Sequence, residues 1–335
     1  MKLKNKIGYL IQRFHFILEF LKNRATENKF LRFAFKIVAP HLIDYEYPIN
    51  FNIETTNACN LGCQMCPRKE SNRPVGYLSM DLCKKIVDEA RMYGSRGFSL
   101  HKDGEPLLHR DLFKIIEYIK KSNPRNTIYL TTNGVFLDEE RALEILKSGV
   151  DRFNISVGAA RKETFEKIKG CDDLGKIEEN VRNFIKLKED GGYKTEVSVQ
   201  IIKMRETIAE IGEFKNKWKK YPVKINTWNF LNWGGAKEDN IGDNAASGVR
   251  YPCYALWFSP AINWDGKVSL CCMDWDEKLI IGDINNQSLA EIWQGEKLEN
   301  YRRLHLRGEY GKIPVCNKCN YWSWWPDIFF GKYKK

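Results

Sequence analysis

The sequence ETTNACNLGCQMC, residues 54–66, brings the cysteines Cys59, Cys63 and Cys66 into one short segment. A β-forming run, 49–55, precedes the cysteines, so we expect the segment to form the loop at the carboxyl end of a strand. Three soft thiolate ligands would hold three irons of a cubane iron-sulfur cluster and leave the fourth iron open. A zinc site would need a fourth ligand, and no other Cys or His lies close in sequence. Zinc and an inert structural cluster are the alternatives.

From residue 47 onward, short β-rich runs alternate with amphipathic helical stretches. The predicted strands are 49–55, 97–101, 127–132, 152–157, 196–202 and 224–230, and the predicted helices are 80–93, 111–121, 138–148, 174–188 and 205–219. Repeated β-then-α units imply parallel strands with right-handed crossovers. Six units are fewer than a closed eightfold barrel needs, so we predict an α/β fold, a partial (β/α)6 TIM-like barrel with its active site at the carboxyl ends of the strands.

The Cys-x3-Cys-x2-Cys motif after Glu54-Thr55-Thr56-Asn57 resembles that of the radical S-adenosylmethionine superfamily. The resemblance implies that the open iron of a catalytic 4Fe-4S cluster chelates the amino and carboxylate groups of S-adenosylmethionine. One electron would then cleave the sulfonium to a 5'-deoxyadenosyl radical, which abstracts a substrate hydrogen. The cofactors bring the radical chemistry, and the protein supplies binding, orientation and protection.

Further motifs of this superfamily are matched one strand at a time. Gly104-Glu105-Pro106 follows the second predicted strand, where the family holds the methionyl amino group, and Asp103 replaces the commonest first glycine. Ser156 ends the fourth strand at the family's ribose-contacting position, with Gly158 where an Asp often stands. The other candidate cofactor contacts are Thr132, Asn133, Gln200 and Asn229. A solvated loop carboxylate is the alternative for Glu105, and structural polar roles are the alternatives for Gln200 and Asn229.

A second set of cysteines, near the C-terminus, contains Gly266-x4-Cys271 and Cys316-x2-Cys319. Asp265-Gly266 is a strong turn dipeptide between two short β-rich runs, 261–264 and 267–270, which predicts a hairpin. With Cys253, this set resembles the SPASM and twitch class of auxiliary-cluster domains, and the absence of cysteines from 321–335 matches the shorter twitch form. That form is found in the butirosin-pathway class of 2-deoxy-scyllo-inosamine dehydrogenases.

The metal ligands implied by the resemblance are Cys59, Cys63 and Cys66 for the catalytic cluster, and Cys253, Cys271, Cys316 and Cys319 for a second 4Fe-4S cluster. Cys272 is left over, because Cys271 completes the Gly-x4-Cys motif. A tetrahedral zinc site is the alternative for the second set. Cys83 and Cys171 have no partner nearby in sequence, and we predict ordinary packing for both.

We predict three regions: a basic amphipathic helical extension at 1–45, the radical S-adenosylmethionine barrel at 46–235 and the auxiliary domain at 236–335. In the extension, apolar residues recur at helical spacing among lysines and arginines. This helix could pack on the barrel, bind a membrane surface or bind a partner. Apolar runs too short to span a bilayer and the cluster-type cysteine spacings predict a cytoplasmic protein, peripheral to a membrane if the helix binds one.

A net charge of +11 is compatible with an anionic small-molecule substrate. No nucleic-acid-binding motif is present, so we expect no nucleic-acid partner. The resemblance implies an electron donor such as flavodoxin or ferredoxin.

If four thiolates fill the auxiliary cluster's coordination, that cluster is suited to accept an electron, which favours oxidation of an alcohol of a sugar, cyclitol or similar molecule. His101 is a candidate catalytic base, with a structural role as its alternative. A peptide-modifying maturase and a non-catalytic electron-transfer protein are the rival functions.

Overall fold

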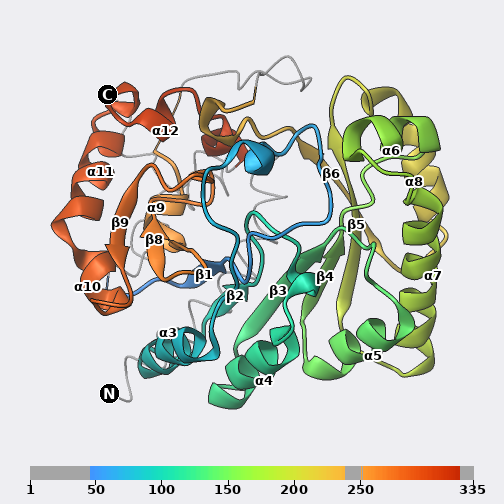
Figure 1. The fold of residues 1–335 in the computed structure, drawn as a ribbon, viewed down its shortest axis with the longest axis horizontal. Helices are drawn as coiled ribbons and strands as arrows, with labels where there is room; N and C mark the ends of the chain where they lie inside the picture. The colour runs from blue at the N-terminus through green and yellow to red at the C-terminus, as the bar shows by residue number, and fades with distance from the viewer. Residues whose placement is uncertain (1–45, 238–249, 251, 325–335) are drawn as a thin grey trace, which may run out of the picture.

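The computed structural model describes residues 46–237, 250 and 252–324 (Figure 1). The predicted helical extension 1–45, most of the polar stretch 236–250 and the terminal residues 325–335 lie outside them. Among the described residues, no helix combines the length and the apolar character needed to cross a bilayer.

Six parallel strands form the body of the molecule, and all six correspond to predicted ones. They are β1 (Asn50–Ile53), β2 (Gly97–Ser99), β3 (Thr127–Thr132), β4 (Arg152–Ile155), β5 (Glu196–Lys203) and β6 (Lys224–Asn229), and each pairs in parallel with its neighbours in sequence. Figure 1 shows the crossover helices along the outer side of these strands. The predicted partial barrel of parallel strands is confirmed.

The helices follow the predicted pattern with two differences. Those matching predicted stretches are α3 (Met80–Met92), α4 (Leu112–Ser122), α5 (Glu139–Ser148), α7 (Leu174–Asp190) and α8 (Ile211–Trp218). The last begins later than predicted, because the Thr207 hydroxyl donates to the Ile202 carbonyl and accepts the Met204 amide, bonds that compete with helix formation. The short helix α6 (Lys162–Lys169) was not predicted, since only Phe165 and Ile168 mark its apolar face, and Gly170 ends it at a φ of 74°.

Helix α3 shows how the local sequence positions a crossover. The Ser79 hydroxyl caps its first turn by accepting the Leu82 amide at 3.1 Å. Its buried residues recur at helical spacing and face the sheet: Leu82, Cys83, Ile86, Val87 and Ala90. Cys83 therefore packs in the core.

The C-terminal part adds three strands to the same sheet. They are β7 (Ala261–Ile262), β8 (Lys267–Ser269) and β9 (Ile280–Asp283), so the strand order is β6-β5-β4-β3-β2-β1-β7-β8-β9. The predicted hairpin is present, with β7 and β8 antiparallel and Gly266 at a φ of +94° in the turn. Strand β7 lies parallel to β1, with Asn52 opposite Ala261, so the hairpin continues the barrel sheet past its first strand (Figure 1).

Four short helices pack around this extension of the sheet. They are α9 (Ala255–Phe258), α10 (Leu289–Gln294), α11 (Glu296–Leu306) and α12 (Pro314–Asn317). A reciprocal capping box of Ser288 and Glu291 begins α10. The cysteines of the second set lie on or beside α9, the end of β8 and α12, and are brought to the β1 edge of the barrel.

Candidate active site and iron-sulfur ligands

The three-cysteine loop lies between β1 and a 3-10 helix, Pro67–Glu70. Its backbone is held by bonds to distant parts of the chain, since the Gln64 amide donates to the Ile168 carbonyl at 2.8 Å. The Arg68 guanidinium donates to the Leu61 carbonyl at 3.1 Å. Cys59, Cys63 and Cys66 are half-buried, and none of them is in a disulfide.

Burial and nearby negative charges oppose ionisation of the Cys59 and Cys66 thiols. Burial raises the pKa of Cys59, and the nearby charges of Glu105 and Cys63 add to the effect. Burial also raises the pKa of Cys66 to about 12, with Asp103, Cys63 and Cys59 acting in the same direction. Thiolates gathered at such a place require a cationic partner, and iron supplies it. The donor set therefore fits a bound iron-sulfur cluster.

Glu105 ties together the loops that follow β1, β2 and β3. Its amide donates to the Ala58 carbonyl at 2.8 Å, and its buried carboxylate accepts the Thr132 hydroxyl and the Asn133 amide, both at 2.7 Å. The Asn133 side chain donates to that of Asn60 at 2.8 Å and lies 4.0 Å from the Cys59 sulfur. The alternative of a solvated carboxylate is thus wrong, because Glu105 is only 2% exposed.

Gly104, beside Glu105, allows these loops to approach closely. A Cβ atom there would lie 2.2 Å from the Thr56 carbonyl oxygen and 2.6 Å from that of Ala58. The next residue, Pro106, opens a short 3-10 helix whose first turn Glu105 caps by accepting the Leu107 amide at 3.1 Å. The Gly-Glu-Pro motif therefore has a structural reason at every position.

Ser156 directly follows β4 and lies beside Gln200, which is within β5 and not at its end as predicted. The Gln200 amide donates to the Ser156 hydroxyl at 3.2 Å and accepts the Asn154 side chain at 2.7 Å. Lys169, at the end of α6, donates to the same hydroxyl at 3.2 Å. Asn229 is exposed, opposite Lys203 at the end of β6. The structure thus joins Ser156 and Gln200 and adds Lys169, a buried cation that no sequence pattern marked.

His101 lies at the end of β2 against polar and aromatic neighbours. Its Nδ1 is 3.2 Å from the Ser99 hydroxyl, and its ring meets the edge of Tyr129 at a centroid distance of 5.1 Å. Burial lowers the pKa of His101 to about 4, so the imidazole is neutral near pH 7 and a weak base. These contacts suit the structural role left open by the sequence.

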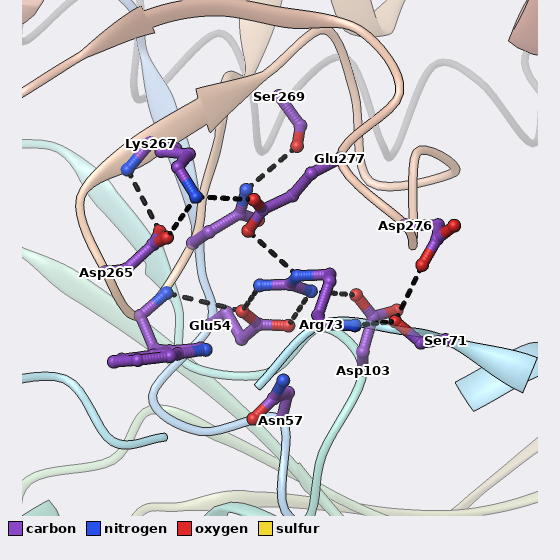
Figure 2. A network of polar contacts seen from close by, with 12 residues as sticks. Glu54, Asn57, Ser71, Arg73, Asp103, Asp265, Lys267, Ser269, Asp276 and Glu277 are labelled. Atoms are coloured by element: carbon purple, nitrogen blue, oxygen red, sulfur yellow. Dashed lines mark hydrogen bonds and ion pairs between the residues drawn. The ribbon is translucent and has the colours of Figure 1, made fainter. Parts of the chain in front are cut away.

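A buried ionic group beside the cysteine loop joins the barrel to the C-terminal hairpin (Figure 2). We call it the Arg73 network; its members are Glu54, Arg73, Lys102, Asp103 and Glu277. Arg73 binds Glu54 at 3.0 Å, Glu277 at 2.8 Å and Asp103 at 3.5 Å. Lys102 binds Asp103 and donates to the Asp274 carbonyl at 3.1 Å.

Burial and opposite charges act against each other on the carboxylates of the Arg73 network. Burial acts to raise the pKa of Glu54, but the Arg73 hydrogen bond and the charges of Lys102 and Arg73 outweigh it and lower that pKa. Burial raises the pKa of Asp103 to about 7, against the opposing charge of Lys102. The charge of Asp103 acts to raise the pKa of both Cys66 and Cys272. The Arg73 network therefore lies within electrostatic range of both cysteine sets.

The second cysteine set is buried or half-buried at the hairpin side of the molecule. Burial raises the pKa values of Cys253 and Cys271 far above the ordinary range, and the charges of Cys316 and Cys319 act in the same direction. The Cys319 sulfur accepts the Tyr321 amide at 3.4 Å. In the described part of the chain, no three Cys, His, Asp or Glu side chains form a set for a single metal ion.

Cys272 differs from Cys271 in its surroundings. Burial raises the pKa of Cys272 to about 11, while Lys102 and a hydrogen bond involving Tyr321 lower it. The charges acting on Cys271 are those of other cysteines. Four indoles in this part of the chain are buried, those of Trp257, Trp275, Trp293 and Trp322.

Comparison with family models gives one match for the barrel and another for the C-terminal cysteine region. Residues 53–217 match the radical SAM superfamily, and residues 253–320 match an iron-sulfur cluster-binding domain, SPASM. The first match contains the three-cysteine loop and β2 to β5. The second contains Cys253, Cys271, Cys316 and Cys319.

Two curated relatives differ in how much of the chain they cover. An S-adenosyl-L-methionine-dependent 2-deoxy-scyllo-inosamine dehydrogenase of Niallia circulans is 24% identical over 80% of this chain and 91% of its own length. A probable GTP 3',8-cyclase of Methanococcus vannielii is 32% identical, but over 54% of this chain and 59% of its own.

Solved structures share the fold at low identity. BtrN in complex with AdoMet and 2-DOIA has a TM-score of 0.58 at 21% identity, covering 81% of this chain and 92% of its own. Streptococcus suis SuiB bound to precursor peptide SuiA has a TM-score of 0.61 at 15% identity, covering 85% and 72%. This chain therefore belongs to the radical SAM superfamily and carries a SPASM domain, which together imply a catalytic 4Fe-4S cluster, an auxiliary cluster and S-adenosylmethionine as its cofactors.

Proposed function

We propose that this radical SAM enzyme oxidises an alcohol of a sugar, cyclitol or similar small molecule, with the auxiliary cluster as electron acceptor. The observation that carries the proposal is a set of four buried or half-buried thiols that lie within electrostatic range of one another. They are Cys253, Cys271, Cys316 and Cys319. Four thiolates would complete the coordination of a cubane cluster and leave no iron for substrate. The dehydrogenase relative, which aligns along 80% of the chain, supports the same reaction class.

The chain's own residues divide the work. Cys59, Cys63 and Cys66 would hold the catalytic cluster, which with S-adenosylmethionine supplies a 5'-deoxyadenosyl radical. Glu105, Thr132 and Asn133 organise the neighbouring loops into one rigid rim. Ser156 and Gln200, with Gly104, Pro106 and Asn229, are the remaining proposed cofactor contacts. Rigid support of this kind fixes the reacting groups in place.

The reaction balances if the auxiliary cluster takes one electron. A carbinol that loses one hydrogen atom from carbon and one proton from oxygen retains one electron more than the ketone does. The substrate would thus gain a C=O double bond, the hydroxyl proton would pass to a base or to solvent water, and the hydrogen atom would end on 5'-deoxyadenosine. A small molecule with an anionic group would suit the basic chain, which carries a net charge of +11.

The cyclase relative is a weaker guide to the reaction. Its similarity covers 59% of that protein, so the rest of the cyclase has no counterpart in the match. The peptide-bound SuiB structure shares the fold, and a peptide substrate is therefore the alternative that the experiment must address.

The first experiment counts iron and sulfide after anaerobic reconstitution of the full chain and of a Cys59, Cys63 and Cys66 to Ala triple variant. We expect about eight irons in the wild type and about four in the variant, with 5'-deoxyadenosine formed by the wild type alone. About four irons in the wild type, with deoxyadenosine still formed, would remove the electron acceptor from the proposal.

The second experiment identifies the substrate class. Sugars and cyclitols deuterated at each carbinol carbon are incubated with the holoenzyme, and deuterium in 5'-deoxyadenosine is measured by mass spectrometry. We expect one ketone per deuterated deoxyadenosine. Deuterium transfer that yields an epimer in place of a ketone, or transfer from peptides alone, would contradict the oxidation proposal.

A further inference from the structure

His305 lies inside the auxiliary module, between two of its cysteines. The residue belongs to α11 and is fully buried. Its Nδ1 accepts the backbone N–H of Cys253 at 3.1 Å, and its Nε2 lies 3.3 Å from the Cys316 sulfur. One imidazole therefore bridges two proposed ligands that are far apart in the chain.

The backbone partner determines which nitrogen of His305 carries the hydrogen. A backbone amide can only donate, so Nδ1 must present its lone pair to Cys253. A neutral imidazole has one N–H, which must then be on Nε2, the atom that faces Cys316. The ring cannot turn easily, because it meets Trp257 and Tyr310 edge to face at centroid distances of 6.4 and 5.1 Å.

An N–H that faces a cysteine ligand affects the cluster that the cysteine holds. Hydrogen bonds to the sulfurs withdraw electron density and stabilise the reduced cluster, which carries more negative charge. His305 and Cys316 are both buried, which shields the contact between them from bulk water. The sulfur is an acceptor in this contact, as an iron-bound thiolate would be.

We propose that His305 is a positioning residue of the auxiliary cluster, whose Nε2–H donates a hydrogen bond to the Cys316 thiolate and raises the cluster's reduction potential. The inference rests on the proposed function only in taking Cys316 as a ligand of that cluster. A raised potential makes the cluster a better acceptor for an electron leaving the substrate. His305 would thereby favour oxidation without touching substrate.

Two amide variants separate the two hydrogen bonds of the ring. In His305→Asn, the side-chain oxygen can take the place of Nδ1 and keep the bond from Cys253, but nothing reaches Cys316. In His305→Gln, the amide nitrogen can take the place of Nε2 and restore the donor to Cys316. The Gln variant is thus the matched control, because it has the same kind of side chain and retains the donor.

The measurement is a redox titration of the reconstituted holoenzyme followed by electron paramagnetic resonance. Adding S-adenosylmethionine should alter the signal of the catalytic cluster, whose open iron binds it, and so mark the unaltered signal as the auxiliary one. In the Asn variant we expect the ratio of reduced to oxidised auxiliary cluster at a fixed potential to fall about tenfold, equivalent to about 59 mV for one electron. The Gln variant should stay close to the wild type.

Iron content makes each outcome decisive. An unchanged auxiliary-cluster potential in the Asn variant, with full iron content, would overturn the inference. Loss of auxiliary iron from both variants would also overturn it, because His305 would then be needed for folding alone. Retention of the auxiliary cluster in Cys316→Ala would also overturn the inference, because Cys316 would then not be a ligand of that cluster. A shifted potential with full iron in an enzyme that oxidises no alcohol would uphold His305 and refute the proposed function instead.

Discussion

The guanidinium of Arg73 donates to both carboxylate oxygens of Glu54, and the two side chains are 6% and 0% exposed. Glu54 directly follows β1, whereas Arg73 follows the cysteine loop and also binds Glu277 of the C-terminal part. This one cation therefore holds the catalytic loop, the barrel and the auxiliary module together.

Replacing Arg73 by Met should destabilise the protein strongly, because it leaves buried carboxylates without a partner. We expect a loss of about 3–5 kcal/mol in the free energy of unfolding, measured by urea denaturation under anaerobic conditions. Arg141→Met is the matched control, since its ion pair with Asp138 is exposed and should contribute less than about 1 kcal/mol. Equal effects of the two substitutions would show that the Arg73 network does not hold the structure.

The same ion pair should make stability depend on pH. The pKa of Glu54 is lowered from its ordinary value of 4.5, so its contribution is complete above that value and is lost as the pH falls through the lower folded-state pKa. The difference in stability between the wild type and Arg73→Met should therefore shrink below about pH 4.5. A difference that stays constant from neutral pH to pH 3 would contradict this assignment.

Gly104→Ala should disrupt the cysteine loop, since the new Cβ would lie within 2.6 Å of two backbone oxygens, those of Thr56 and Ala58. We expect a loss of about 1–3 kcal/mol of stability and poor retention of the catalytic cluster, measured by unfolding and by iron content. Gly212→Ala, in α8, meets no atom within 4 Å and should instead stabilise the helix by up to about 1 kcal/mol. Full iron and normal stability in Gly104→Ala would show that the loop can move aside.

Glu105→Gln should weaken the rim of the active site. Both carboxylate oxygens accept hydrogen bonds, so a Gln side chain must direct its own NH2 group at a donor. We expect a loss of about 1–3 kcal/mol in stability together with weaker binding of S-adenosylmethionine, measured by unfolding and by equilibrium dialysis. Glu117→Gln, on the exposed side of α4, should change stability by less than about 0.5 kcal/mol. Unchanged binding in Glu105→Gln would remove Glu105 from the cofactor contacts.

Replacing Cys271 and Cys272 in turn should identify the auxiliary ligand. The charges acting on Cys271 are those of the other cysteines, whereas Cys272 also feels Lys102 and Asp103. Reconstituted Cys271→Ala should therefore hold about four irons and Cys272→Ala about eight, because a 4Fe-4S cluster needs its four thiolates. The reverse result would assign Cys272 as the ligand and would place Cys271 in the packing of the hairpin.

Much of the architecture could be read from local patterns. The six parallel strands and the Asp265–Gly266 hairpin follow from periodicity and turn chemistry, which act over a few residues. The cysteine spacings likewise carry their meaning within short segments. The late start of α8 was missed because the Thr207 hydroxyl bonds to the backbone of Ile202 and Met204, and a helical pattern does not reveal that competition.

The sequence by itself determined the barrel, the two cysteine sets and the chemical class of their cofactors, because periodicity and ligand spacing are local properties of the chain. Only the tertiary structure decided that the hairpin continues the barrel sheet at β1, that Arg73 meets Glu277, and that His305 directs its Nε2 at Cys316. Arg73, Lys102 and Lys169 look like ordinary surface cations in the sequence. Their roles depend on burial and on partners distant in the chain, which packing alone brings together.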